Sequence, residues 1–354
     1  MDVNGYTLDQ VEPAELPEAE QQAIARLFQR MARETVPEDP VRPLEAILPR
    51  LRSKAPGQWS SRIRARDAKG EVVGWGVVGR NLNGPKNTHL GWVELSVHPD
   101  HRRKGLGRAL MAELVRASDG QHPELTFMGM VNDRAPAGEA FLRTLGAQSG
   151  LPMKTNQLAI ADVDRSRVAE WAKIDAPGYT LELVDNVVPD RLMRAYLEAA
   201  NGMNDAPRGD LKMADWKLTE EQVRDRESWL KQVGVQWWLI VAVHDATGAG
   251  AGFTEVNHDP KQPWIVHQGG TATVPGHRGH KLGLWMKAAN LQRVLAELPE
   301  AKYIRTGNAN TNAQMLGINT QLGFTLAWQS AIWQLPAVDA KKDLDRAEKI
   351  AAAR

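Results

Sequence analysis

The chain has 354 residues and no cysteine, and its 44 lysine and arginine residues against 43 acidic residues give a net charge of +1. The absence of cysteine excludes disulfides, cysteine-ligated zinc, iron–sulfur clusters and a cysteine nucleophile, and no metal site is expected. The balanced charge disfavours a nucleic-acid partner, and the longest apolar run, residues 237–243, is far shorter than the ~20 residues of a membrane span. The N-terminus also lacks the pattern of a signal peptide, so we expect a cytoplasmic protein of two domains.

The first half of the chain alternates strands and helices. Ile24, Leu27, Phe28 and Met31 recur at helical spacing and predict a helix there. The expected helices are residues 18–34, 44–52, 105–117 and 135–145, and the expected strands are residues 6–11, 59–67, 71–81, 88–97 and 124–131. Two further strands are expected to close this half by about residue 163.

The second half follows the same order after a short helix at residues 165–173. The expected strands are residues 179–184, 236–244, 250–257, 264–274, 303–307 and 324–335, and the expected helices are residues 190–203, 219–233, 283–298 and 312–322. A charged, alanine-rich end predicts a terminal helix. This order predicts an α/β (α+β) fold in which each half forms a mixed, mostly antiparallel sheet flanked by helices.

Short motifs recur between the halves at a spacing of 173–177 residues. GYTLDQV at residues 5–11 returns as GYTLELV at 178–184, and PDHRRKGLG at 99–107 returns as PGHRGHKLG at 275–283. A period of this length fits a duplicated whole domain. The expected division is a first domain at residues 1–164, a linker at 165–177, a second domain at 178–336 and a helical tail at 337–354.

The most informative stretch joins the strand that ends at Val97 to the helix that begins near Gly105. Backbone N–H groups at a helix N-terminus lack intrahelical partners and bind anions. Glycine at residues 105 and 107 lets a diphosphate approach the backbone, and four basic side chains add positive charge. The spacing fits neither the Walker loop nor the dinucleotide fingerprint. The stretch therefore predicts a different kind of diphosphate-binding turn.

This Arg-x-x-Gly-x-Gly run after Val-x-Pro resembles the acetyl-CoA pyrophosphate loop of GCN5-related N-acetyltransferases (GNAT). In that family an asparagine follows the next strand, and the helix after it ends in an LGF or LGA turn. Asn132 with LGA at 145–147, and Asn308 with LGF at 322–324, match this pattern. The resemblance covers nearly the whole chain and implies two tandem GNAT domains, an arrangement similar to that of mycothiol synthase and other actinobacterial proteins.

The resemblance implies acetyl-CoA as cofactor, with its pantetheine arm between two strands that splay apart. The implied cofactor-binding residues of the first copy are Leu95, Ser96, Val97, Arg102, Arg103, Lys104, Gly105, Leu106, Gly107, Arg108 and Asn132. Those of the second copy are Thr271, Thr273, Arg278, Gly279, His280, Lys281, Leu282, Gly283, Asn308 and Asn312.

The second copy departs from the family pattern because Lys281 stands where the first loop glycine is expected. Lys281 then faces solvent, reaches a phosphate or narrows the site. The asparagines around the next strand–helix junction leave two alternatives open. Either Asn310 caps the helix, or Asn308 or Asn312 contacts the cofactor.

Acetyl transfer to an amine needs a base, because an alkylamine with a pKa of ~10.4 is protonated at neutral pH. The candidate bases are Glu94 in the first copy and His267 in the second, where some family members carry a catalytic glutamate. The structural alternatives are a paired sheet carboxylate and a structural histidine. The N–H of Val97, near an expected strand bulge, is the candidate donor to the thioester oxygen.

Many relatives use a tyrosine four residues before the glycine of the LGF turn as general acid. Leu142 and Asn319 occupy those positions here. Either water protonates the leaving thiolate, or one copy is not catalytic.

A polar loop at residues 203–210, together with Trp216, is the candidate acceptor pocket, with Asn204, Asp205 and Trp216 as substrate-binding residues. An ordinary surface insertion is the alternative. The expected activity is direct acetyl transfer to the primary amine of a small molecule. Acetylation of a protein lysine or N-terminus and a non-catalytic, CoA-binding scaffold are the competing functions. The oligomeric state is not encoded.

Overall fold

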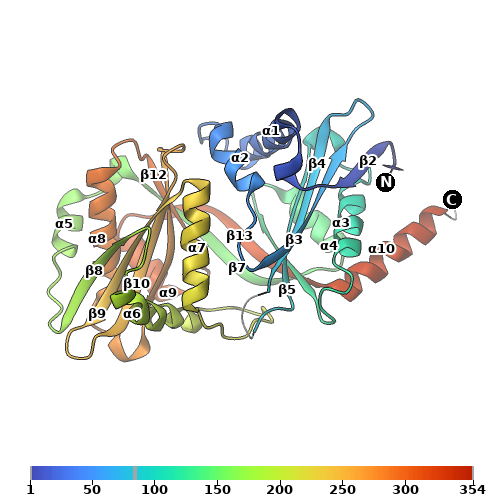
Figure 1. Cartoon of the computed structure of the whole chain (residues 1–354). Coiled ribbons are helices and arrows are strands. Elements are labelled where there is room, and N and C mark those ends of the chain that lie inside the picture. Colours follow the sequence, from blue (N-terminus) through green and yellow to red (C-terminus); the bar gives the residue numbers. More distant parts are fainter. Residues whose placement is uncertain (1, 83–85, 353–354) are drawn as a thin grey trace. The chain divides into compact units, whose positions relative to one another are not determined.

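The computed structural model describes residues 2–82 and 86–352. The chain divides into two units, each built around its own part of the β-structure (Figure 1). The first unit comprises Met1–Pro152, Gly209–Ala214 and Ser330–Arg354, and the second comprises Met153–Arg208 and Asp215–Gln329.

The sheet of the first unit has the strand order β1-β2-β3-β4-β5-β6-β13. Its strands are β1 (Asp2–Val3), β2 (Tyr6–Gln10), β3 (Gln58–Arg66), β4 (Val72–Asn81), β5 (Leu90–Val97), β6 (Thr126–Asn132) and the second part of β13 (Thr325–Pro336). Neighbouring strands are antiparallel except β5 and β6, which are parallel.

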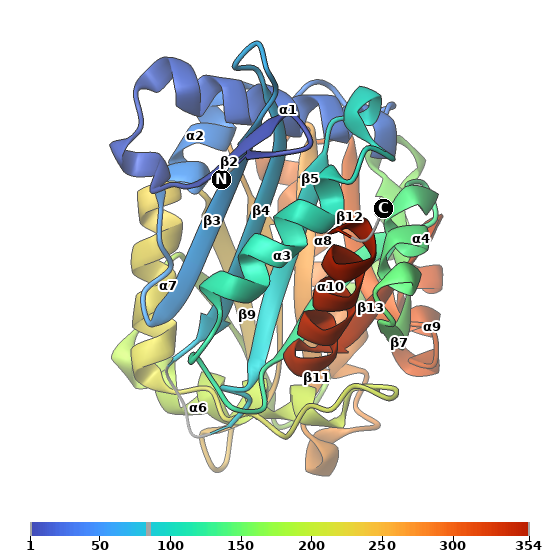
Figure 2. The same ribbon diagram turned by 90° about the vertical axis from the view of Figure 1, so that its right-hand side faces the viewer.

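Helices cover both faces of this sheet. They are α1 (Glu18–Thr35), α2 (Leu44–Arg52), α3 (Leu106–Ala117), α4 (Pro136–Thr144) and α10 (Ala337–Ala352). On one face α3 packs through Leu110 and Leu114, and α10 lies beside it (Figure 2). On the other face α1 and α2 enclose Trp75. Burial of these apolar side chains stabilises the unit and fixes where α3 begins.

The second unit has the strand order β7-β12-β11-β10-β9-β8. Its strands are β8 (Tyr179–Asp185), β9 (Gln236–His244), β10 (Ala249–His258), β11 (Ile265–Thr273), β12 (Tyr303–Ala309) and most of β7 (Gln148–Ala159). Its helices are α5 (Arg165–Trp171), α6 (Asp190–Asn201), α7 (Glu220–Val233), α8 (Leu282–Glu297) and α9 (Ala313–Gln321). Consecutive residues of a strand face opposite sides, so Trp237 packs with α6 and α7 whereas Trp238 packs with α5 and α8.

The expected order of elements is confirmed, and the bounds of the expected elements differ from the observed ones by no more than two residues. One prediction was wrong: a single long strand, β7, stands where two further strands were expected. The expected tail is helix α10 as far as residue 352, and residues 353–354 lie outside the described part of the chain.

The last strands are distributed in a way that the repeat does not indicate. Residues 153–159 of β7 pair with β12 of the second unit, and residues 330–336 of β13 pair with β6 of the first. The strands of each unit therefore include one segment from the other half of the sequence. In the described ranges no helix is long and apolar enough to cross a membrane.

Candidate active site

Two loops with the same backbone conformation precede α3 and α8. In the first loop, Arg103 and Gly105 have φ angles of 62° and 84°; at the equivalent positions of the second, Gly279 and Lys281 have 88° and 58°. All four residues are in the left-handed region. Both loops follow a short 3-10 helix, η2 (Pro99–His101) or η5 (Pro275–His277). The conserved conformation shows that the sequence repeat extends to the backbone of the turn.

A tyrosine–histidine pair supports each loop, with the tyrosine on β2 in the first unit and on β8 in the second. The hydroxyl of Tyr6 lies 3.2 Å from Nδ1 of His101, and that of Tyr179 lies 3.0 Å from Nδ1 of His277. These pairs couple the repeated GYTL motif to the repeated loop, which explains why both recur with nearly the same spacing.

The position of Gly105 favours glycine for two reasons. Its φ is positive, and a Cβ atom there would lie 2.8 Å from Nδ2 of Asn4. Lys281 adopts the same conformation with a side chain, at a cost of about 1 kcal/mol. The loop of the second unit therefore keeps the backbone geometry despite the substitution.

The first arginine of each loop is held by the protein itself. The guanidinium of Arg102 donates to both carboxylate oxygens of Glu34 at 2.7 and 2.6 Å, and its Nε donates to the carbonyl of Val97 at 3.2 Å. Hydrogen bonding from Arg102 lowers the pKa of Glu34 below its ordinary value. Arg278 repeats the arrangement with Asp205 at 2.7 Å and the carbonyl of Thr273 at 3.4 Å. These arginines brace the loops.

The remaining cations differ in availability. Arg108 forms an ion pair with Asp343 at 2.5 Å. Arg103 and Lys104 are exposed and make no ion pair within the described part of the chain, as is also true of Lys281 in the second loop. Free positive charge beside the α3 N-terminus therefore comes from residues 103 and 104.

The predicted splaying of strands beside each loop is confirmed. Strand β5 pairs with β6 only over Leu90–Trp92, and β11 pairs with β12 only over Ile265–His267. Beyond these points β5 continues to Val97 and β11 to Thr273 without a ladder on that side. Each unit thus presents backbone N–H and C=O groups to an extended, peptide-like molecule. Leu95, Ser96, Val97, Thr271 and Thr273 all lie on these edges.

Glu94 lies on this free segment of β5, opposite Val77 of β4. Its side chain is exposed and makes no hydrogen bond or ion pair with a described residue, so the alternative of a paired sheet carboxylate is not observed. Partial desolvation by the surrounding strands nevertheless raises its pKa. The expected bulge near Val97 was wrong, because β4 and β5 pair in regular register from Gly91 to Val97.

A bulge occurs instead in the second unit, where Gly269 and Gly270 of β11 lie opposite the single residue Glu255 of β10. The buried Glu255 carboxylate accepts hydrogen bonds from Nε1 of Trp237 at 2.8 Å, Nη1 of Arg226 at 2.8 Å and the amide of Gly270 at 3.2 Å. Gly270 aligns with Glu94, so a carboxylate from the neighbouring strand lies beside the position that carries one in the first unit. The sequence analysis missed Glu255; the only acidic residue of this strand was the available signal.

His267 is the last residue of β11 that pairs with β12, opposite Arg305, and its side chain is exposed. Lying at the point where the strands separate, it borders the free segment of β11 rather than the loop.

The asparagines of the two units have defined local partners. Asn132 accepts from the amide of Arg134 at 3.1 Å, and Asn308 accepts from Nδ2 of Asn319 at 2.8 Å. Asn312 caps α9 by accepting from the amide of Met315 at 3.2 Å. The alternative in which Asn310 caps this helix is therefore wrong, because the cap is Asn312, two residues later.

In the predicted acceptor loop, the polar side chains of Asn204 and Asp205 bind other residues of the same unit. Asn204 exchanges two hydrogen bonds with the backbone of Trp216, at 2.8 and 3.1 Å, and Asp205 is occupied by Arg278. The side chain of Trp216 remains 37% exposed. Among the three predicted substrate-binding residues, Trp216 alone has no polar side-chain group engaged in holding the loop.

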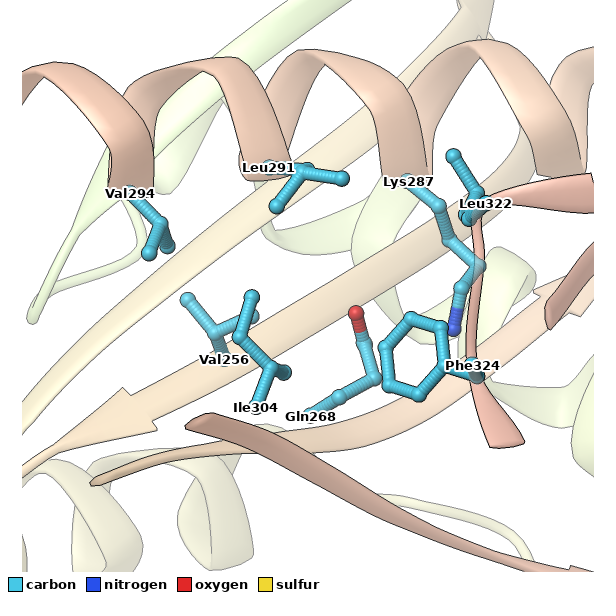
Figure 3. A pocket seen from close by; sticks show the side chains of 8 residues that line it. All are labelled: Val256, Gln268, Lys287, Leu291, Val294, Ile304, Leu322 and Phe324. Carbon is cyan, nitrogen blue, oxygen red and sulfur yellow. The ribbon is translucent and has the colours of Figure 1, made fainter. Parts of the chain in front are cut away.

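A small pocket, with space for about one water molecule, lies between α8 and the strands beneath it (Figure 3). It is lined by Val256, Gln268, Lys287, Leu291, Val294, Ile304, Leu322 and Phe324. Lys287 is only 2% exposed, and burial lowers its pKa to about 7. The sequence analysis did not single out this lysine, although helical periodicity places it on the buried face of α8 with Met286 and Leu291.

The described residues contain no group of three or more histidine, aspartate or glutamate side chains able to hold a metal ion. What the two sites offer is a helix N-terminus with exposed cations, a free strand edge and nearby carboxylate or imidazole groups. This set suits a phosphate-bearing molecule with an extended amide-containing arm.

Comparison with known proteins agrees with this description. Residues 22–146 match the model of the acetyltransferase (GNAT) family. A mycothiol acetyltransferase from Stackebrandtia nassauensis is 26% identical over 301 residues, which cover 79% of this chain and 84% of that protein. A tandem GNAT protein from the clavulanic acid biosynthesis pathway superposes with a TM-score of 0.75 at 26% identity, covering 94% of this chain and 98% of that one. A GCN5-related N-acetyltransferase from Sphaerobacter thermophilus, 15% identical, shares the fold with a TM-score of 0.63, covering 94% of this chain and 96% of that one.

Proposed function

Because the chain belongs to the GCN5-related N-acetyltransferases and has their tandem arrangement, we propose that it transfers an acetyl group from acetyl-CoA directly to a primary amine of a small molecule. The observation that carries this proposal is the recurrence, in both units, of a left-handed turn at a helix N-terminus next to a strand whose edge is free.

In the first unit, the amides of residues 103–108 and the side chains of Arg103 and Lys104 bind the diphosphate. The free edge of Leu95, Ser96 and Val97 hydrogen-bonds to the pantetheine arm. Arg102 positions the loop through Glu34 instead of contacting a phosphate. The bound acetyl-CoA supplies an activated acetyl thioester, and the chain supplies orientation and proton transfer.

Glu94 accepts the proton of the acceptor amine in the first unit, directly or through a water. Its raised pKa brings the basicity of the carboxylate closer to the value that suits proton transfer near neutral pH. In the second unit His267 takes this role at the fork of β11 and β12, while Glu255, paired with Arg226, holds the amide of Gly270 at the bulge.

A small acceptor is favoured over a protein because the mycothiol acetyltransferase relative is named for a small molecule. The two clefts are also not alike: β5 keeps a regular register, whereas the second unit has the bulge and the glutamate beside it. We infer that the units divide their tasks, with different acceptors or different rates.

Calorimetric titration of acetyl-CoA into the purified chain tests the cofactor. Two binding events are expected, and Gly105→Val, which places a Cβ against Asn4, removes one of them. Gly120→Val, at another left-handed glycine that lies beyond the C-terminal end of α3 and is not crowded, is the matched control and retains both. Absence of any binding by the folded chain contradicts the proposal.

Thiol release from acetyl-CoA, followed over a panel of small amines and lysine peptides, tests the acceptor. Turnover with an amine metabolite and not with peptides is expected. Glu94→Gln and His267→Ala then assign the reaction to one unit. Turnover that survives both substitutions together rules out these residues as bases, and preference for peptides overturns the acceptor class.

A further inference from the structure

Strands β5 and β6 are inner strands of the sheet of the first unit, yet one of their faces carries exposed apolar side chains. Trp92 of β5 is 39% exposed and Met130 of β6 is 56% exposed. Ile332 of β13, the ladder partner of Met130, is half-buried on the same face. Large apolar side chains that gather on one exposed face mark a binding surface.

The opposite face of these strands is closed. Val93 and Leu95 of β5 and Val131 of β6 alternate with the exposed residues and pack into the apolar core under α3. The core fills that side of the fork between β5 and β6. An acceptor therefore reaches the fork from the face that carries Trp92 and Met130.

Glu94 supplies the charge of this exposed face. It lies two residues after Trp92 on β5, so the two side chains project to the same side from Cα atoms roughly 6–7 Å apart. The Glu94 carboxylate is exposed and has no ion-pair or hydrogen-bond partner within the described part of the chain. Its cross-strand neighbour Val77 packs in the apolar cluster with α1 and α2. An unpaired carboxylate between apolar side chains complements a cationic amine that is joined to an apolar group.

The second unit carries polar side chains at the equivalent place. The last ladder pair before the fork is Trp92 with Met128 in the first unit and His267 with Arg305 in the second. Each ladder has three pairs before its strands part, so these positions correspond. The backbone of the fork therefore does not require an apolar side chain there, and the two units differ in the polarity that they offer to an acceptor.

We propose that Trp92 determines the acceptor specificity of the first unit by selecting a primary amine that carries an aromatic ring about two carbons from its nitrogen. This inference rests on the proposed function, which places the acetyl thioester at the fork of β5 and β6 and makes Glu94 the base. With the amine at the Glu94 carboxylate, the ring lies against the indole of Trp92, and Met130 borders it from β6. Trp92 binds the part of the acceptor that does not react and takes no part in the proton transfer.

A longer acyl chain on the thioester is the competing occupant of this face. Such a chain is apolar but uncharged, and it would leave the Glu94 carboxylate beside it without a partner. An amine with an aromatic group satisfies both the carboxylate and the indole, so the charge of the face favours the acceptor over the donor.

Steady-state kinetics of the full chain with His267→Ala tests the inference, because this background leaves the first unit as the source of turnover. The probes are 2-phenylethylamine and ethanolamine, which share the aminoethyl group and differ in the aromatic ring. We expect kcat/KM to be at least about tenfold higher for 2-phenylethylamine. Trp92→Gln is expected to abolish this preference by raising the KM for 2-phenylethylamine, with the KM for acetyl-CoA and the rate with ethanolamine unchanged.

Two further variants separate specificity from a general effect on the fold. Trp92→Phe keeps an aromatic face and is expected to keep the preference. Val338→Gln is the matched control, because it removes another exposed apolar side chain of the first unit, on α10 at the opposite face of the sheet. It is also expected to keep the preference, and circular dichroism verifies that each variant is folded.

Equal kcat/KM for the two amines, or a preference that survives Trp92→Gln, overturns the inference and leaves the proposed function standing. A Trp92→Gln variant that changes the choice between acetyl-CoA and butyryl-CoA instead of the choice between amines has the same meaning. Turnover that disappears in the His267→Ala background also overturns the inference, because the first unit then has no acceptor. Absence of both CoA binding and acetyl transfer in the wild-type chain overturns the proposed function itself.

Discussion

Gly105 and Lys281 occupy the same left-handed position at the start of equivalent helices, with φ angles of 84° and 58°. The residue two positions earlier is also left-handed in both units, but there the order is reversed, arginine at 103 and glycine at 279. Each loop therefore has one glycine and one strained basic residue. The two loops therefore keep the same backbone shape. The basic residue in the left-handed conformation comes first in one loop, at Arg103, and last in the other, at Lys281.

Replacement of Lys281 by glycine is expected to stabilise the second unit by about 0.5–1 kcal/mol, because relief of the left-handed strain exceeds the entropy that glycine adds to the unfolded chain. The urea midpoint measures the change. The mirror substitution, Gly105→Lys, is expected to destabilise by more, since its Cβ also meets Asn4. A lower midpoint for the glycine variant would show that the Lys281 side chain makes a compensating interaction.

The pair between Arg102 and Glu34 is expected to contribute about 1–2 kcal/mol of coupling energy in a double-mutant cycle with Arg102→Met and Glu34→Gln. The pKa of Glu34 is lowered by Arg102, so this contribution is complete above the ordinary carboxyl pKa and disappears as the pH falls through the lowered value. Thermal melts of the wild type and the three variants, at neutral and at acidic pH, give the coupling energy at each pH.

The matched pair of Arg278 and Asp205 serves as control for that cycle. Its side chains are 44% and 48% exposed, against 23% and 27% for Arg102 and Glu34. The coupling is therefore expected to be at most about 0.5 kcal/mol. Equal coupling at the two loops would contradict the view that burial strengthens the first.

Glu94→Gln is expected to reduce acetyl transfer by the first unit at least about 100-fold, since a general base contributes 10²–10⁴-fold. A base must be ionised, so the wild-type rate rises with pH through the raised pKa of Glu94, and this acid limb vanishes in the variant. The same substitution is expected to raise the melting temperature slightly at neutral pH, because the folded chain then no longer holds a partly desolvated carboxylate. A loss of rate with an unchanged pH profile would mean that Glu94 positions the substrate without taking its proton.

Sequence patterns predicted the local structure well, because helices and turns depend mainly on residues that are close together in the sequence. The apolar face of α1 and the strand–turn–helix around Gly105 follow from spacing and from glycine, and the 176-residue repeat of PDHRRKGLG correctly placed a second copy of the turn. Lys281 kept its conformation because the Tyr179–His277 pair and the helix that follows hold it, and both belong to the same repeat.

Long-range partners escaped prediction for a physical reason. A strand such as β13 has the same apolar pattern whichever sheet edge it joins, so nothing in residues 325–336 specifies that the second part pairs with β6. The pair between Arg102 and Glu34 was not predicted either, because Glu34, 68 residues earlier, is one of many acidic residues on helix surfaces.

Lys287→Met is expected to stabilise the chain most at neutral and lower pH. The folded-state pKa of Lys287 is about 7, whereas an unfolded lysine titrates near 10.4, so below pH 7 the folded state carries the full cost of a buried ammonium. That cost is on the order of several kcal/mol and disappears as the pH rises from 7 toward 10, where both states are neutral. Denaturant midpoints of wild type and variant are therefore expected to converge with rising pH. A constant difference across this range would show that Lys287 stays protonated in the folded chain up to the pH at which an unfolded lysine titrates, so that its pKa is not lowered.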